Sequence, residues 1–235
     1  MRILLTFSPV DDFSYDSINK HTVQGLVYSL IREEDVDEYH NLPRFKFFCF
    51  SDIFPIGDFR VGQEKNVLIS SPNEYLIESM TKTLRAERRF KLGDHDIEAR
   101  HKVVRPELSS RFISASPITI YEDNRQNRYY SFERNSDLSF FLQRIKENAI
   151  KKYNAFYMEN YDLTGNIFDR LVFRKEVSVR AKRGDKEFII IGSVWKLLEK
   201  YGIDTVENRK FYEFIMDCGL GEKNSLGFGF INPLR

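Results

Sequence analysis

The sequence has few cysteines and no long apolar run. Its two cysteines, Cys49 and Cys218, stand far apart in 235 residues, and neither has a C-x-x-C partner. This pattern argues against a disulfide framework and against a zinc site. No stretch approaches the roughly 20 apolar residues of a membrane-spanning helix, and the chain opens on strand-forming residues without the apolar core of a signal peptide. We therefore expect a protein of the reducing cytoplasm that does not enter a membrane.

The chain also lacks a large excess of either charge. It carries 36 lysines and arginines against 35 acidic residues, which gives a formal net charge of +1. Any basic surface must therefore be a local patch. Two stretches are locally basic: residues 170–186 have seven basic against two acidic residues, and residues 82–105 have eight against four. Net charge alone does not indicate a nucleic-acid-binding protein, but these stretches leave room for one.

The hydrophobic pattern repeats one arrangement twice. In the first half it predicts strands over residues 1–7, 45–50, 67–70 and 95–105, and helices over residues 16–32 and 72–85. In the second half it predicts strands over residues 113–121, 168–183, 187–198 and 228–232, and helices over residues 136–153 and 206–217. Both halves follow the order β-α-β-β-α-β, the split βαβ arrangement of ferredoxin-like folds. The sequence thus predicts an α+β protein with two tandem ferredoxin-like domains, residues 1–110 and residues 111–235.

One predicted strand in the second half is basic on one face. Its alternation places four cations opposite a row of apolar side chains: Arg170, Arg174, Arg180 and Lys182. Such a face can contact RNA phosphates, and a plain solvated strand face is the alternative. Tyr129 and Tyr130, or exposed phenylalanines, are further candidates, because an aromatic ring can stack on an unpaired base. Packing in the core is the alternative, and the sequence does not distinguish the two.

The residues after the last predicted helix form a glycine-rich loop. Four of the twelve glycines fall in the eleven residues GLGEKNSLGFG, which run from Gly219 to Gly229. A loop of this kind between a helix and a strand can aim backbone N–H groups at phosphates. The alternative is a tight connection into an edge strand. The spelling is not GxxxxGK[ST] and no helix follows it, so a P-loop is excluded.

The same loop closely resembles the C-terminal glycine-rich signature of the CRISPR repeat-processing endoribonucleases of the Cas6 family. The segment QGLVYSLI, residues 24–31, is similar to the first helix of that family. The resemblance implies cleavage of CRISPR repeat RNA once in each repeat, without a metal or another cofactor. The upstream 2′-hydroxyl would attack the adjacent phosphate and leave a 2′,3′-cyclic phosphate and a 5′-hydroxyl. It also implies RNA contacts from the loop, at Gly219, Gly221, Lys223, Asn224, Ser225, Gly227 and Gly229.

The resemblance further implies a catalytic set of His40, Tyr28 and Lys46. A histidine suits proton transfer because its unperturbed pKa is about 6.5, and a lysine supplies a positive charge beside the reacting phosphate. His40 would act as general base or acid, Tyr28 as its partner and Lys46 as the electrostatic stabiliser, a role that Arg44 could take instead. From the residues alone, the alternatives are a surface histidine, a core tyrosine and a solvent-facing lysine.

Two other functions stay open at this point. One is an RNA-binding subunit of a CRISPR effector complex that does not cleave. The other is a ferredoxin-like enzyme that holds a small phosphate-bearing ligand in the glycine-rich loop. For the leading interpretation, the expected partners are precursor CRISPR RNA, effector-complex subunits and a second copy of the chain in a homodimer.

Overall fold

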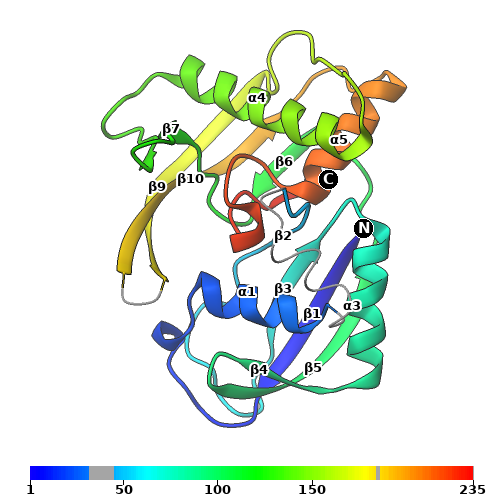
Figure 1. Cartoon of the computed structure of the whole chain (residues 1–235), viewed down its shortest axis with the longest axis vertical. Coiled ribbons are helices and arrows are strands. Elements are labelled where there is room, and N and C mark those ends of the chain that lie inside the picture. Colours follow the sequence, from blue (N-terminus) through cyan, green and yellow to red (C-terminus); the bar gives the residue numbers. More distant parts are fainter. Residues whose placement is uncertain (32–44, 184–185, 235) are drawn as a thin grey trace.

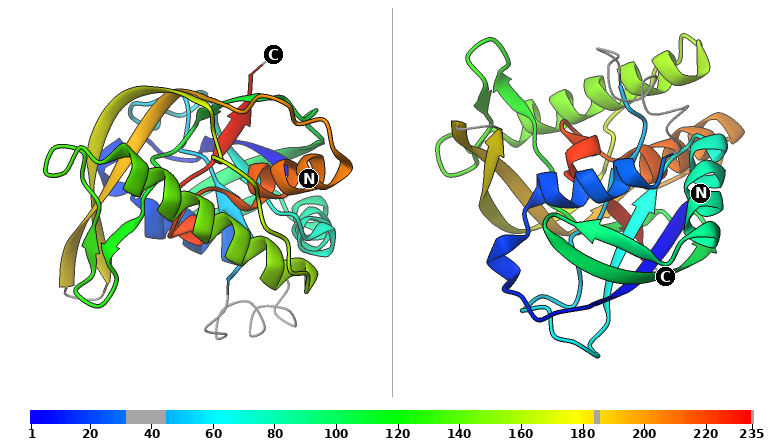
Figure 2. Two further views of the ribbon diagram at one scale, coloured as in Figure 1. Left: turned by 90° about the horizontal axis from the view of Figure 1, so that it is seen from above. Right: turned by 60° about the horizontal axis from the view of Figure 1, so that its bottom comes forward.

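The computed structural model describes residues 1–31, 45–183 and 186–234, which form two antiparallel sheets with two long helices on each. The first sheet has the strand order β2-β3-β1-β5-β4. Its elements are β1 (Arg2–Pro9), a 3-10 helix (Tyr15–Ser17), α1 (Lys20–Ser29), β2 (Cys49–Phe50), β3 (Lys65–Ser70), α3 (Glu74–Ala86), β4 (Arg89–Leu92) and β5 (His95–Val104). Apart from β4, an added edge strand, this is the ferredoxin-like order. Figures 1 and 2 show α1 crossing the sheet and α3 running alongside β1 and β5.

The second sheet repeats this arrangement, with the strand order β11-β6-β10-β9. Its elements are β6 (Arg111–Ser114), a hairpin of β7 (Tyr121–Asp123) and β8 (Arg128–Tyr129), α4 (Leu138–Tyr157), β9 (Arg170–Arg183), β10 (Lys186–Glu199), α5 (Val206–Cys218), a 3-10 helix (Asn224–Leu226) and β11 (Ile231–Pro233). The predicted pair of ferredoxin-like units is confirmed. The proposed boundary near residue 110 falls between the end of β5 and the start of β6.

Polar side chains set the starts of the helices. Asn19 accepts hydrogen bonds from the amides of His21 and Thr22 and so caps α1, while Asn73 caps α3. Asp137 and Thr205 do the same for α4 and α5. Each cap satisfies amides that the first helical turn leaves without partners. None of the helices within the described ranges is long and apolar enough to cross a membrane.

Three predicted elements differ from the structure. The helix expected from residue 16 begins at Lys20, because the Asn19 cap separates it from the short 3-10 helix. The strand expected from residue 45 is limited to β2, because Phe47 takes the left-handed conformation, with φ 51°, which strand pairing does not allow. The strand expected over residues 113–121 ends at Ser114, shortly before Pro117, whose nitrogen has no hydrogen to donate.

The N-terminal strand is joined to the second unit by a buried arginine. Arg2 is 2% exposed, and its guanidinium donates to Asp217 Oδ1 at 3.1 Å, to Met216 O at 2.7 Å and to Ile231 O at 3.0 Å. The amino group of Met1 binds the same Asp217 carboxylate. These bonds hold the start of β1 against α5 and β11, so the two sheets share a fixed interface.

Candidate functional site

The glycine-rich loop and Lys46 line one cavity between the two units. Its volume is about 230 Å³. The lining consists of Phe45, Lys46, Phe47, Phe48, Lys152, Cys218, Gly221, Glu222, Lys223, Asn224 and Ser225. We call it the loop cavity. It therefore brings together a predicted catalytic residue and predicted RNA-binding residues that are about 175 positions apart in the sequence.

Aromatic packing fixes the segment that carries Lys46. The Phe47 ring packs against Phe156 of α4 at 5.0 Å and against Phe214 of α5 at 6.5 Å, measured between ring centroids. Ser71 Oγ donates a hydrogen bond to Phe47 O at 2.6 Å. Partial burial lowers the pKa of the neighbouring Lys46 ammonium. An anion in the cavity would favour its charged form.

Tyr28 approaches the loop cavity from α1 and is not among the described residues that line it. Its ring meets the edge of Phe48, a lining residue, with the centroids 5.7 Å apart and the planes at 89°. Burial of the half-buried phenol raises the pKa of Tyr28. A tyrosine hydroxyl is protonated at neutral pH even without this shift, so it can donate a hydrogen bond.

His40 and Arg44 lie outside the described residues. The described chain continues from α1 to Ile31 and resumes at Phe45, which lines the loop cavity. The candidate catalytic set is thus described at Tyr28 and Lys46 only.

The glycine-rich loop packs tightly against the first unit. A Cβ at Gly227 would lie 2.1 Å from the ring of Phe50, and one at Gly229 would lie 1.8 Å from Leu220 O. Both residues also have φ 77°, which side chains disfavour. From α1, Lys20 Nζ donates to Gly227 O at 2.5 Å, and Gln24 Nε2 donates to Ser225 O at 2.8 Å. The loop is therefore a structural joint between α1, β2 and the second unit.

Several backbone amides of the loop already donate hydrogen bonds to carbonyl oxygens of the protein. Leu220 N donates to Gly229 O, Glu222 N to Thr119 O, Gly227 N to Asn224 O, and Gly229 N to Pro117 O. The side-chain amide of Asn224 donates to Leu220 O and Phe228 O, both at 2.9 Å. Lys223, at the turn before the 3-10 helix, is exposed. The loop thus presents a lysine side chain to solvent, and much of its backbone serves its own fold.

Lys152 binds the buried side of the glycine-rich loop, and the sequence analysis did not identify it. It projects from α4, is 2% exposed and donates to Gly219 O at 2.7 Å, to Gly221 O at 3.1 Å and to Asn224 Oδ1 at 2.7 Å. Burial lowers the pKa of its ammonium, while the nearby Cys218 and Glu222 oppose that shift. Three acceptors satisfy the three hydrogens of the ammonium, so a buried cation fixes the first half of the loop, from Gly219 to Asn224.

The basic strand face is spread along β9. Arg170 lies beside Glu199, with an N to O distance of 3.7 Å, whereas Arg180 is ten residues further along, about 33 Å at the usual rise of a strand. Arg174 is exposed between them. Lys182 belongs to β9, but its side chain is outside the described part. These cations therefore do not converge on one point.

Arg180 borders a larger groove between the two units. The groove has a volume of about 700 Å³ and lies between the start of α1 and the strand β9. Lys20 and Asp52 of the first unit line it, and they form an ion pair at 2.5 Å. For Tyr129 and Tyr130 the structure favours the core alternative, because both are 4% exposed and part of the second unit's packing. Tyr129 stacks on Tyr121 with the centroids 4.8 Å apart, so neither tyrosine is available to a base.

Comparison with known proteins decides the family. The family model described as CRISPR associated protein Cas6, C-terminal, matches residues 100–233. A protein of Methanocaldococcus jannaschii named CRISPR-associated endoribonuclease Cas6 2 is 48% identical over the full length of both chains. This chain belongs to the Cas6 family. The prediction of an endoribonuclease family from the glycine-rich loop is therefore confirmed.

Solved structures agree with the Cas6 fold. One described as CRISPR associated protein Cas6 superposes with a TM-score of 0.70 at 24% identity, and the match covers 100% of this chain and 99% of the other. Another, described as a RAMP protein binding different RNA substrates, gives a TM-score of 0.73 at 19% identity over all of both chains. At these identities the likeness supports the Cas6 fold, with its two ferredoxin-like units, and carries no residue roles.

Proposed function

We propose that this Cas6 protein binds CRISPR repeat RNA and cleaves it once in each repeat to mature CRISPR RNA. The 2′-hydroxyl of the upstream nucleotide attacks the adjacent phosphate without a metal and leaves a 2′,3′-cyclic phosphate and a 5′-hydroxyl. The observation that carries the proposal is the loop cavity, where Lys46 and residues 221–225 line the same space. The name of the Methanocaldococcus jannaschii relative supports the activity.

The reaction needs a base, an acid and a positive charge beside the reacting phosphate. We assign the charge to Lys46, which lines the cavity. We assign hydrogen-bond donation to Tyr28, because its ring contacts Phe48 of the cavity lining and its phenol is protonated at neutral pH. We assign proton transfer to His40. Phe45 is five positions after His40 in the chain, a span of at most about 18 Å, so the assignment is compatible with chain length.

Binding of the RNA is assigned to the exposed cations around the interface between the units. Lys223 and Ser225 border the loop cavity, while Arg180 borders the neighbouring groove. The loop cavity is lined by the glycine-rich loop, and the neighbouring groove is lined by the start of α1. The two elements are in contact, because Lys20 of α1 donates a hydrogen bond to Gly227 O of the loop. Gly219, Gly221, Asn224, Gly227 and Gly229 would then shape the loop that presents these groups. Arg170, Arg174 and Lys182 stay predicted phosphate contacts.

Cleavage of end-labelled repeat RNA in EDTA tests the chemistry. A single cut that persists in EDTA, and that one 2′-deoxy substitution at the scissile position blocks, is the expected result. A cut that needs added Mg²⁺ would refute the mechanism. Tight binding without any cut would favour the non-cleaving subunit. Sedimentation of the protein alone and with effector subunits tests the predicted homodimer and complex.

A substitution of His40 tests its role. We expect His40→Ala to abolish the cut and to leave the affinity for RNA unchanged, because the imidazole moves a proton and contributes little binding energy. His95→Ala is the control, since the His95 ring stacks on Phe13 with the centroids 3.8 Å apart and lines neither the loop cavity nor the neighbouring groove. Cleavage by His40→Ala at the rate of the control would remove His40 from the mechanism.

A further inference from the structure

A second basic surface lies on the first unit, apart from the loop cavity. It is a groove of about 800 Å³ between the end of α3 and the strands β1 and β5. The groove exists because β4 is shorter than its neighbour. The β4–β5 pairing ends at Arg89 and Glu98, whereas the β1–β5 pairing continues to Arg2 and Val104. Within the described chain, the outer edge of β5 beyond Ala99 therefore has no partner strand.

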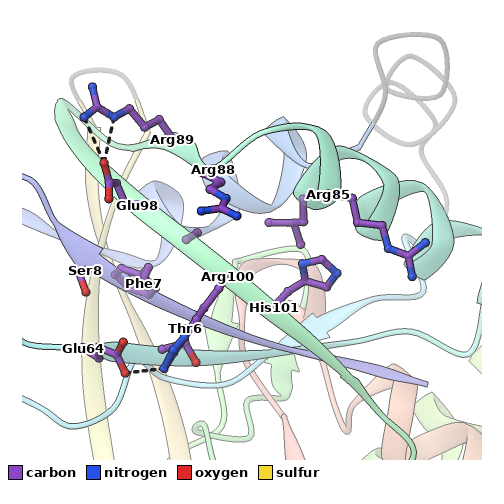
Figure 3. Close-up of a pocket in the computed structure, with 12 residues that line it drawn as sticks. Thr6, Phe7, Ser8, Glu64, Arg85, Arg88, Arg89, Glu98, Arg100 and His101 are labelled. Carbon is purple, nitrogen blue, oxygen red and sulfur yellow. Dashed lines mark hydrogen bonds and ion pairs between the residues drawn. The ribbon is translucent and has the colours of Figure 1, made fainter.

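Arginines from two elements converge on this groove. Figure 3 shows Arg85, from the last turn of α3, and Arg88, which follows the helix, on one side of β5 and Arg100 projecting from the strand itself. Arg100 pairs with Glu64 at 2.7 Å, and Arg89 pairs with Glu98 at 3.1 Å. Arg85 and Arg88 form no ion pair with any residue that the structure describes. Two guanidinium groups thus remain uncompensated over the exposed edge.

The basic surface continues along the strand. An adjoining cavity of about 400 Å³ shares Arg85 and is also lined by Lys82, by Glu78 and by Arg105, which pairs with Glu74 at 3.4 Å. His101, which lies in the first groove, adds little charge at neutral pH, because burial and the charge of Arg85 both lower its pKa. The positive charge along this edge therefore comes from arginine and lysine and does not depend on pH in the physiological range.

The chemistry of the lining suits a phosphate backbone. Guanidinium groups bind phosphate oxygens in a bidentate manner. Of the two aromatic rings in the lining, Phe7 is 1% exposed and cannot stack on a base, and the other is the partly buried imidazole of His101. Contacts here would thus be mainly electrostatic and independent of sequence. A net charge of +1 for the whole chain makes such a cluster a local feature and not a consequence of overall charge.

We propose that this groove binds the phosphate backbone of single-stranded RNA that flanks the segment held at the loop cavity. The inference rests on the proposed function for the identity of the RNA. It adds a contact outside the repeat-cleaving site, so that the precursor binds more tightly than the isolated repeat.

The test compares two RNAs, the isolated repeat and the repeat with about twenty unpaired flanking nucleotides. Both carry a 2′-deoxy at the scissile position, so that binding is measured without cleavage. The variant is Arg85→Gln with Arg88→Gln, and the control is Arg111→Gln with Arg209→Gln, two exposed arginines of the second unit. Affinity is measured by fluorescence anisotropy from about 50 to 200 mM salt, the range over which phosphate contacts weaken strongly.

We expect the flank to tighten binding by wild-type protein and by the control, and the groove variant to lose that gain. The slope of log K against log salt for the flanked RNA should fall by about 1.4 in the variant, since each single-strand phosphate contact contributes about 0.7. An equal gain and slope in variant and control would overturn the proposal. A competition experiment gives a second refuting result. The proposal also fails if an acidic peptide displaces the flanked RNA at concentrations at which RNA of unrelated sequence does not displace it.

Oligouridine of the same length separates this proposal from the proposed function. If wild-type protein fails to cleave repeat RNA but binds oligouridine, and the groove variant alone loses that binding, the groove stands and the proposed function fails. If repeat RNA is cleaved while oligouridine binds all three proteins equally, the groove proposal fails and the proposed function stands.

Discussion

Replacing Lys152 by methionine is expected to destabilise the glycine-rich loop strongly. Lys152 makes three hydrogen bonds of 2.7 to 3.1 Å to Gly219 O, Gly221 O and Asn224 Oδ1. Hydrogen bonds that involve a charged group contribute about 1.5–3 kcal/mol each. Removing the buried ammonium also removes its desolvation cost, which is several kcal/mol. The difference leaves a net loss of about 3 kcal/mol in the free energy of unfolding, because three buried oxygens remain without donors.

Lys151→Met is the matched control. Lys151 precedes Lys152 on α4 and is exposed, so the substitution removes the same charge without touching the loop. In urea unfolding we expect Lys152→Met to lose about 3 kcal/mol and the control to stay within about 0.5 kcal/mol of wild type. For a chain of this size the loss corresponds to a fall of about 6–12 °C in Tm. Amide exchange at Gly227 and Gly229 should also quicken. Equal stability and equal exchange in the two variants would refute the assigned role of Lys152.

Three other predictions concern single residues. Gly229→Ala should prevent the loop from closing, because its Cβ would lie 1.8 Å from a carbonyl oxygen. Gly25→Ala is the control: its Cβ would meet no atom within 4 Å, so the Tm should stay unchanged or rise slightly. The cleavage rate should fall on the alkaline side below pH 10.5, because burial lowers the pKa of Lys46 and its charge is lost earlier than in an ordinary lysine. Lys46→Arg should move that fall to higher pH, and an unchanged pH profile would contradict the assignment. Arg2→Leu should cost about 3–5 kcal/mol in urea unfolding by leaving the buried Asp217 carboxylate short of a partner, and a loss below about 1 kcal/mol would show that the interface does not depend on it.

The fold was largely predictable because its signals are local. Apolar periodicity and cap residues such as Asn73 and Thr205 act within a few positions, and the structure has helices and strands where they indicate. The strand expected at residues 45–50 was too long because packing of Phe47 against α4 and α5 outweighs its strand propensity. The burial of Tyr129 could not be predicted for a similar reason, since exposure is decided by the neighbours that a residue meets across the fold.

The site was predictable only in part. The glycine-rich loop was recognisable from its sequence motif, and Lys46 was assigned through the family resemblance. Lys152 carries no such signal, since a lysine on an amphipathic helix normally faces solvent. The role of Arg2 could not be predicted either, because nothing near the N-terminus indicates a partner more than 200 residues away.

The sequence by itself determined the two ferredoxin-like units, their element order and the family, because periodicity, capping and the loop motif are encoded in neighbouring residues. Only the tertiary structure decided that Lys46 and the glycine-rich loop share a cavity, that Lys152 supports the loop from beneath, and that β5 extends past β4 to leave a basic groove. These features depend on which distant segments come into contact when apolar surface is buried, and the linear spacing of residues does not contain that information.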